Sequence, residues 1–291
     1  MEYTIKNSHL TVRISRMGGE LRSVKSAEGL EYLWQGDPKY WGDRAPNIFP
    51  YVGRLTKGQY TLNGKAYDMP GHGFVGKSAL NVKSQSEDSI SLELKSSPAT
   101  YKIYPFDFIY RIHYRLQDHT LHISYEVRNE SASVMYFGIG GHPGFNVPLE
   151  NGLAFEDYAL EFSRAHTPFR INFTPACFLD GTRTEYPLEE NIRIPLAHNL
   201  FDQDAIVLAQ MDRTVSLKSS KGSHGVTVAY PDMTYLGFWH RPESDAPYVC
   251  IEPWASLPSR QDIVEDLSKQ PDLISLKSGS EYINNWSITL W

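Results

Sequence analysis

The chain has 291 residues with a formal net charge of -6, and 13% of the residues are aromatic. The negative charge offers no basic surface for nucleic acid, and no run of about 20 apolar residues could span a membrane. Cys177 and Cys250 provide neither a disulfide framework nor metal-ligand spacing, and the N-terminal residues lack a secretion-signal pattern, so we expect a cytoplasmic protein.

The first predicted elements are a strand and a short turn. Apolar and polar residues alternate over residues 10–14, which is the period of a half-buried strand. Asp37 and Pro38 predict a short helical turn that reaches Trp41, because aspartate caps such a turn and proline suits its first position.

Three hairpins follow in the sequence. Asn63 and Gly64 separate two short apolar segments and predict a type I′ turn, in which both central residues need a positive φ. The alternating segments that form the other two antiparallel pairs are residues 80–82 with 90–94, and residues 106–116 with 121–127.

The second half of the chain is irregular at first and then returns to strands. Residues 150–203 are rich in proline, although residues 158–162 still resemble a strand. Later strands are predicted at residues 214–218, 226–230, 235–239, 248–251 and 282–290.

Residues 259–270 are the one good helix candidate. Ile263, Val264 and Leu267 have helical spacing, and Ser259 with Asp262 resembles an N-terminal cap. Many short strands, hairpin turns and almost no helix predict an all-β fold, a large antiparallel sandwich or barrel with one short helix near the C-terminus. No linker divides the chain, so we expect a single domain over residues 1–291.

Four stretches contain groups suited to proton transfer or sugar binding. His142 lies between Gly140-Gly141 and Pro143-Gly144 at a strand end, where glycine leaves room for a close approach. His72 also lies between glycines, Arg54 follows Gly53, and Glu252 ends an apolar strand. Each residue alone has an ordinary structural explanation, but together they suggest an acid, a base and two polar groups that hold a ligand.

Other chemistries have weaker support in the sequence. No G-x-S-x-G nucleophile motif, P-loop or dinucleotide motif is present. The histidines and Glu252 lack metal-ligand spacing, so neither a metal nor a cofactor is expected. A glycosidase needs a pair of carboxylates, and Glu252 with Asp204 or Asp202 keeps that class open.

The motifs together resemble the aldose 1-epimerase (galactose mutarotase) family, and most closely its LacX-type subgroup. They are Asn47-x-Phe49-Pro50-x-x-Gly53-Arg54, His72-Gly73-Phe74, Gly141-His142-Pro143-x-Phe145-Asn146 and Glu252-Pro253, in family order. The resemblance covers nearly the whole chain and implies a large antiparallel β-sandwich, with the sugar in an open cleft on a concave sheet face.

The resemblance also implies roles for individual residues. His142 matches the general acid of the family and Glu252 its general base. Arg54 and His72 match residues that contact the sugar, and Asn47 is also expected to bind the substrate. The sugar-binding aspartate is expected at Asp204, with Asp202 as the second choice.

Mutarotation of a hexose such as glucose or galactose is therefore the expected activity, by acid–base opening and closure of the ring. The resting site is expected to hold Glu252 ionised and His142 protonated on opposite sides of the sugar. Two alternatives are an epimerase of hexose 6-phosphates, for which Arg44, Lys77 or Arg241 would have to lie near Arg54, and a non-catalytic carbohydrate-binding protein.

The chain departs from full-length mutarotases in one motif. Those enzymes usually have a bulky aromatic residue after His-Pro, where this chain has Gly144. The expected partner is a small-molecule sugar, and the protein is expected to be a monomer or a homodimer.

Overall fold

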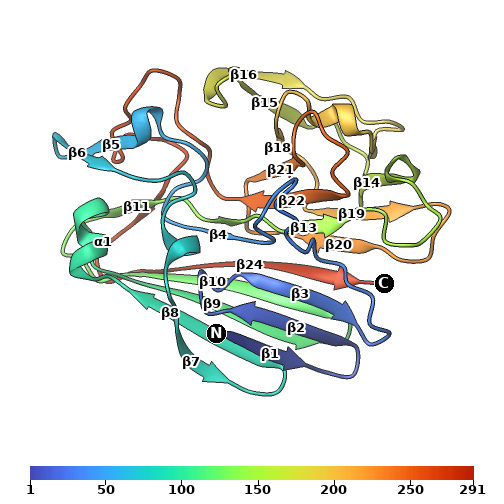
Figure 1. Ribbon diagram of the computed structural model, residues 1–291. Helices are drawn as coiled ribbons and strands as arrows, with labels where there is room; N and C mark the ends of the chain where they lie inside the picture. Colours follow the sequence, from blue (N-terminus) through green and yellow to red (C-terminus); the bar gives the residue numbers. More distant parts are fainter.

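Two large antiparallel sheets form the body of the protein, and the computed structural model describes residues 1–291 (Figure 1). The strands of the nine-stranded sheet are, in spatial order, β17 (Arg193–Pro195), β14 (Tyr158–Phe162), β19 (Thr214–Ser219), β20 (Val226–Ala229), β24 (Glu281–Leu290), β10 (Thr120–Asn129), β9 (Phe108–Gln117), β8 (Ser89–Lys95) and β7 (Asn81–Gln85). The strands of the eight-stranded sheet are β16 (Leu179–Glu185), β15 (Phe169–Phe173), β18 (Ile206–Ala209), β21 (Tyr235–Trp239), β22 (Tyr248–Trp254), β12 (Gly140–Gly141) and β4 (Asn47–Ile48), with β13 (Gly144–Asn146) also paired to β22.

Three smaller sheets complete the fold. Their strands are β1 (Glu2–Lys6), β2 (Leu10–Ser15) and β3 (Leu21–Ser26), then β5 (Gln59–Leu62) with β6 (Lys65–Asp68), and β11 (Met135–Phe137) with β23 (Ile274–Leu276). The β1–β3 sheet lies beside the β7–β10 end of the nine-stranded sheet (Figure 1), where the N–H of Lys6 donates to the backbone oxygen of Glu87. The all-β antiparallel prediction is confirmed.

The three predicted hairpins are present. Asn63 and Gly64 have φ values of 52° and 76°, as a type I′ turn requires, and they join β5 to β6. In the β9–β10 pair, Tyr114 lies opposite Ile123, and both side chains are buried. The apolar face of this pair belongs to a core cluster of 65 buried residues that also includes side chains of the eight-stranded sheet.

The eight-stranded sheet has two different faces because side chains alternate along each strand. On β22, Val249 and Ile251 point into the large core, whereas Glu252 and Trp254 lie on the opposite face. On β21, Phe238 joins the core and the next residue, Trp239, lies on the opposite face. The face turned away from the core therefore combines polar and aromatic side chains.

The predicted helix at residues 259–270 is wrong, since these residues form turns and isolated bridges. Their backbone pairs with another segment instead: the N–H of Thr61 donates to the oxygen of Glu265 (2.8 Å), and the N–H of Leu267 donates to the oxygen of Thr61 (2.9 Å). Asp262 has a φ of 60°, which a right-handed helix does not allow.

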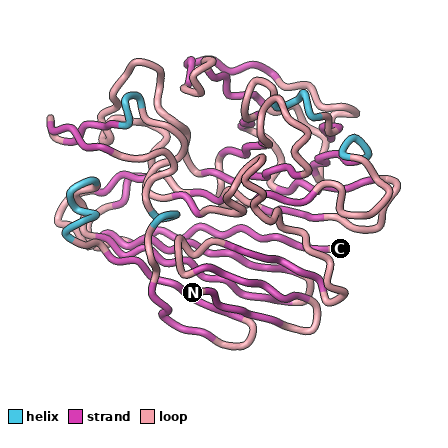
Figure 2. Tube along the Cα trace, in the orientation of Figure 1, coloured by secondary structure: helices cyan, strands magenta, loops and turns pink.

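Helical structure is limited to short segments (Figure 2). The α-helix α1 (Pro98–Ile103) was not predicted, although Ser97 caps it and Pro98 occupies its first position. The 3₁₀ turns are η1 (Thr56–Gly58), η2 (Val75–Lys77), η3 (Phe155–Asp157) and η4 (His198–Phe201). None of these helices has the length and apolar character needed to cross a bilayer.

Candidate active site

A cleft of about 540 Å³ lies on the face of the eight-stranded sheet that is turned away from the large core. Five of the six predicted site residues line it: Arg54, His72, His142, Asp204 and Glu252. These residues come from five separate segments of the chain, so the fold brings together groups that are up to about 200 positions apart.

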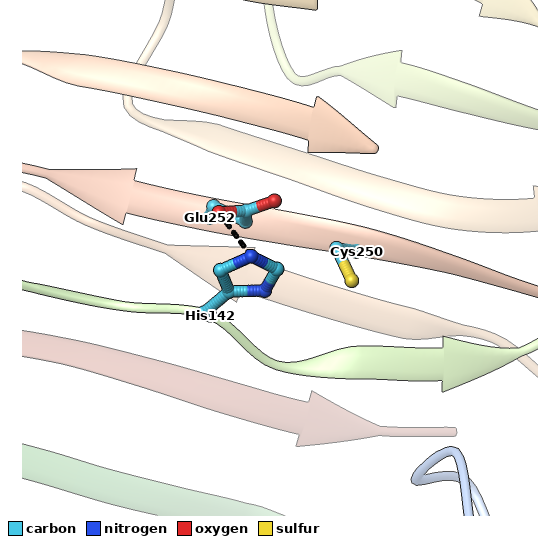
Figure 3. Close-up of side chains that lie close together, drawn as sticks. All are labelled: His142, Cys250 and Glu252. Atoms are coloured by element: carbon cyan, nitrogen blue, oxygen red, sulfur yellow. Dashed lines mark ion pairs between the residues drawn. The ribbon is translucent and has the colours of Figure 1, made fainter. Parts of the chain in front are cut away.

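His142 and Glu252 meet at the floor of the cleft. Their atoms Nε2 and Oε2 are 3.1 Å apart, and the side chains are only 12% and 2% exposed. Figure 3 shows the imidazole directed at the carboxylate, while Cys250 extends from the same strand as Glu252. The contact lacks hydrogen-bond alignment, and Oε2 of Glu252 and Nδ1 of His142 have no hydrogen-bond partner. Both atoms therefore keep an unused hydrogen-bonding capacity.

Glycines bring His142 this close to β22. Gly140 pairs with Trp254 of β22, and Gly141 pairs with Asn47 of β4. A Cβ atom on Gly141 would lie 2.7 Å from the ring of Trp286, and one on Gly140 would lie 2.7 Å from the backbone oxygen of Pro253. Because any side chain would clash there, the close approach inferred from the sequence is a requirement of the packing.

Burial shifts both members of the pair toward their uncharged forms. It raises the pKa of the Glu252 carboxyl well above its usual range, and the negative charge of Asp204 adds to this. It lowers the pKa of His142 well below its usual range, and His72 adds to that shift. A low-dielectric environment disfavours either charge. The pKa shifts thus run against the ionised resting pair expected from the sequence.

His72 is fixed in one tautomer by the loop that carries Arg54. The N–H of His72 donates to the oxygen of Gly53 (2.9 Å), and the N–H of Gly53 donates to Nδ1 of His72 (3.3 Å). Burial, together with the charge of Arg54, lowers the pKa of His72 to about 4. His72 is therefore neutral near pH 7, with its proton on Nε2, and it can donate a hydrogen bond to a ligand.

Asp204 is the aspartate that lines the cleft, whereas Asp202 is exposed at the end of η4 and lies outside it. The carboxylate of Asp204 accepts hydrogen bonds from the N–H of Ala205 (3.0 Å) and from the thiol of Cys177. Burial and Asp204 raise the pKa of Cys177 to about 11, so the thiol stays protonated as a donor. Cys177 was not among the predicted site residues, and the sequence around it gives no signal.

Asn47 lies outside the cleft, in contrast to the other predicted residues. Its side chain is 3% exposed, and its amide donates to the backbone oxygens of Gly18 (3.0 Å) and Gly19 (3.1 Å). Its Oδ1 accepts from the hydroxyl of Tyr125 (2.8 Å). Asn47 therefore supports β4 beneath His142, because Pro46 accepts the backbone N–H of His142 (3.1 Å).

Tryptophans form much of the cleft wall. Trp41, Trp239 and Trp254 all line it, and the ring centroids of Trp41 and Trp239 are 5.6 Å apart at 81°. The sequence signalled Trp254 through its place two residues after Glu252, but Trp41 and Trp239 were missed. Flat apolar rings beside hydrogen-bonding groups match the mixed character of a sugar, which has apolar C–H faces and a hydroxyl rim.

The donor atoms of His142, Cys250 and Glu252 lie within 4.8 Å of one another, close enough to hold a metal ion. Metal binding requires the thiolate and the carboxylate, however. Burial and Glu252 raise the pKa of the Cys250 thiol well above its usual range, and Glu252 is shifted the same way. The chemistry of this donor set therefore favours proton transfer over metal coordination.

Comparisons with known proteins found matches over nearly the whole chain. Residues 1–287 match the family model described as aldose 1-epimerase. The chain is 31% identical to the chromosomal LacX protein of Lactococcus lactis, over the whole chain and 99% of that protein.

Solved structures show the same fold at full length. A galactose mutarotase related enzyme from Lactobacillus acidophilus is 37% identical with a TM-score of 0.95, covering 100% of this chain and 97% of the other. A galactose mutarotase-like protein from Lactobacillus casei is 30% identical with a TM-score of 0.95, and both chains are covered completely.

We expect Asn47→Ala to destabilise the protein without weakening ligand binding. Loss of the bond to Gly18 leaves a buried carbonyl group unpaired, whereas Gly19 keeps its bond from the Tyr114 hydroxyl; the loss costs about 1–3 kcal/mol and lowers Tm by roughly 2–10 °C. Thermal melts of this variant and of the exposed Asn151→Ala control measure the difference. An unchanged Tm together with weaker sugar binding would instead make Asn47 a ligand contact.

We expect Glu252→Gln to raise Tm at pH 7.5 by about 2–4 °C, the shift that roughly 1 kcal/mol produces. The pKa of Glu252 is higher in the folded than in the unfolded protein, so the wild-type protein loses stability as the pH rises from the unfolded-state pKa to the folded-state pKa. The increase in Tm caused by Glu252→Gln is therefore largest above the raised pKa of Glu252. It disappears below about pH 4.3, where the glutamate is protonated in both the folded and the unfolded protein.

Thermal melts between pH 4 and pH 8 test this, with exposed Glu243→Gln as the control. A lower Tm of Glu252→Gln at pH 7.5 would show that the native state holds a stabilised carboxylate–imidazolium pair.

Proposed function

The chain belongs to the aldose 1-epimerase family, and we propose that it interconverts the α and β anomers of an unphosphorylated hexose such as glucose or galactose. The observation that carries the proposal is the contact between Nε2 of His142 and Oε2 of Glu252, 3.1 Å apart at the floor of the cleft. An acid and a base side by side suit this reaction, because the two oxygens that exchange protons are bonded to the same sugar carbon.

The reaction opens and closes the sugar ring. Glu252 removes the proton of the anomeric hydroxyl while His142 protonates the ring oxygen, so the bond between C1 and the ring oxygen breaks and a free aldehyde forms. Rotation about the C1–C2 bond and closure with both proton transfers reversed give the other anomer. The side-by-side geometry replaces the opposite-face arrangement expected from the sequence.

The pair can act from the uncharged resting state that burial favours. A carboxylic acid beside a neutral imidazole holds the same number of protons as a carboxylate beside an imidazolium. Transfer of the carboxyl proton from Glu252 to His142, once the 3.1 Å contact aligns as a hydrogen bond, produces the reactive pair. Sugar hydroxyls that approach the carboxyl group of Glu252 from the cleft stabilise the carboxylate and so favour the transfer.

The remaining polar groups are suited to holding the sugar. His72 offers a neutral Nε2–H donor, Arg54 a guanidinium and Asp204 a carboxylate acceptor, and all three line the cleft. Fixed donors and acceptors of this kind orient a ligand, while Trp239 and Trp254 supply apolar contact area.

The charge of the cleft favours a free sugar over a sugar phosphate. Two arginines line it, Arg54 and Arg241, against four carboxyl groups, Asp43, Asp204, Glu243 and Glu252. Of the other basic residues considered, Lys77 and Arg44 do not line it, and Arg44 donates instead to the oxygens of Arg22 and Gln35. A phosphate group is normally held by a surplus of basic donors.

We expect Glu252→Gln and His142→Asn each to slow anomer exchange by about 10²- to 10⁴-fold, because each removes one proton-transfer group. Polarimetry on freshly dissolved α-glucose and α-galactose measures the rate. His122→Asn, an exposed histidine of β10, serves as the matched control and should retain the wild-type rate.

Wild-type rates in both variants would refute these acid and base roles. Sugar binding by the wild-type protein without faster exchange would identify a carbohydrate-binding protein instead.

We expect kcat/KM for free glucose or galactose to exceed that for the 6-phosphates by about tenfold or more, since the acidic cleft repels a dianion. Coupled assays with both kinds of sugar measure the ratio, and Arg241→Gln should leave turnover of the free sugars nearly unchanged. A preference for the phosphates that disappears in Arg241→Gln would identify a hexose-6-phosphate epimerase.

A further inference from the structure

The residue after His142 and Pro143 has no side chain, and an aromatic ring from a distant segment occupies the space beside it. A Cβ atom on Gly144 would lie 3.1 Å from the ring of Trp41 and 3.2 Å from Cβ of Trp34. These distances are shorter than ordinary van der Waals contacts. Gly144 thus allows Trp41 to pack against the loop that carries His142.

The segment that carries Trp41 is anchored to Gly144 at both ends. The N–H of Trp34 donates to the oxygen of Gly144 (2.9 Å), and the N–H of Gly144 donates to the oxygen of Arg44 (2.8 Å). Inside the segment, the indole N–H of Trp34 donates to the oxygen of Trp41 (2.9 Å), and the N–H of Trp41 donates to the oxygen of Asp37 (2.9 Å).

Contacts of Tyr40 and Lys39 with Asp245 hold the same segment from outside the cleft. The hydroxyl of Tyr40 donates to Oδ1 of Asp245 (2.8 Å), and Nζ of Lys39 lies 3.7 Å from the same oxygen. Asp245 belongs to the loop between β21 and β22. The position of Trp41 is therefore set by backbone bonds on one side and by a neighbouring loop on the other.

The ring held in this way faces the imidazole of His142. Their centroids are 4.9 Å apart at 33°, close to an offset stack, while Trp239 and His72 meet the imidazole edge-on at 5.8 and 5.5 Å. Tyr248 stacks on Trp41 at 5.7 Å and 30°. His142 can thus turn its Nε2 toward Glu252 only in the narrow space that these rings leave.

We infer that Trp41, admitted by Gly144, is a positioning residue for His142: its indole orients the imidazole toward Glu252 and favours the imidazolium that protonates the sugar. The inference rests on the acid role of His142 proposed above. A cation over the face of tryptophan is stabilised by the electrons of the ring, most strongly where water is excluded. This attraction opposes burial, which otherwise keeps His142 neutral.

Other groups that act on the charge of His142 come from several elements. Glu252 and Cys250 face it from β22, and His72 faces it from the loop before η2. The other charged residues that line the cleft are Asp43, Arg54, Asp204, Arg241 and Glu243. The rings of His72 and Trp239 meet His142 edge-on, so removing the Trp41 indole removes the ring whose face lies against the imidazole.

The test compares Trp41→Leu, Trp41→Phe and Gly144→Ala with the wild-type protein. We expect Trp41→Leu to lower kcat about tenfold with KM changed less than about twofold, the pattern of a group that acts on the transition state alone. The pH at which His142 loses its proton in the kcat profile should fall by about one unit. Trp41→Phe, which keeps an aromatic face, should restore most of both quantities.

Gly144→Ala extends the test without touching the cleft. A Cβ atom pushes the indole away from its place, so kcat should fall by a few-fold, and the same substitution in the Trp41→Leu protein should have no further effect. Trp291→Leu, which removes a half-exposed tryptophan outside the cleft, is the matched control and should change nothing.

A direct titration separates this inference from the proposed function. NMR of the histidine rings, with the His142 signal identified through His142→Asn, reports its protonation whether or not the sugar turns over. A lower His142 pKa in Trp41→Leu supports the inference. An unchanged pKa, or a variant that raises KM and leaves kcat intact, overturns it, whereas a wild-type protein that does not accelerate anomer exchange refutes the proposed function instead.

Discussion

Alternation of side chains along β22 is the constraint on which the cleft depends. Val249 and Ile251 fill the large core, and this fixes Cys250, Glu252 and Trp254 on the opposite face. A slip of one residue would turn the carboxyl group into the core. The same packing leaves Glu252 only 1% exposed, so the strand that aims the carboxyl group also deprives it of water. The position of the Glu252 carboxyl group and its raised pKa thus both result from the packing of β22.

Local patterns predicted most strands of the nine-stranded sheet, where several strands have a hairpin partner that is adjacent in sequence. The β9–β10 pair and the Asn63-Gly64 turn needed no information from elsewhere in the chain. The same approach wrongly predicted a helix at residues 259–270, since the backbone of this segment pairs with Thr61, about 200 positions away. The proline-rich middle contains three strands that were missed: β16 is polar and almost wholly exposed, β17 has only three residues, and β15 alternates apolar and polar residues over only five positions.

For the candidate site, too, local motifs identified some residues and missed others. His142, Glu252, His72 and Arg54 were found because each follows a glycine or ends an apolar strand within a recognisable motif. Asn47 belongs to one of these motifs but faces the interior, a direction that no motif encodes. Trp41 could not be found from the sequence, because its role depends on an empty space beside Gly144 and on two hydrogen bonds that only the folded chain provides.

The place of β24 in the nine-stranded sheet has a consequence for biosynthesis. This strand lies between β20 and β10, so it joins the half that contains β7–β10 to the half that contains β14, β17, β19 and β20. A ribosome delivers residues 281–290 after all of these other strands. The two halves therefore emerge with unpaired edges that only a late strand can cover. Such pairing of distant segments is intrinsically slow, and the nascent protein depends on avoiding aggregation until β24 arrives.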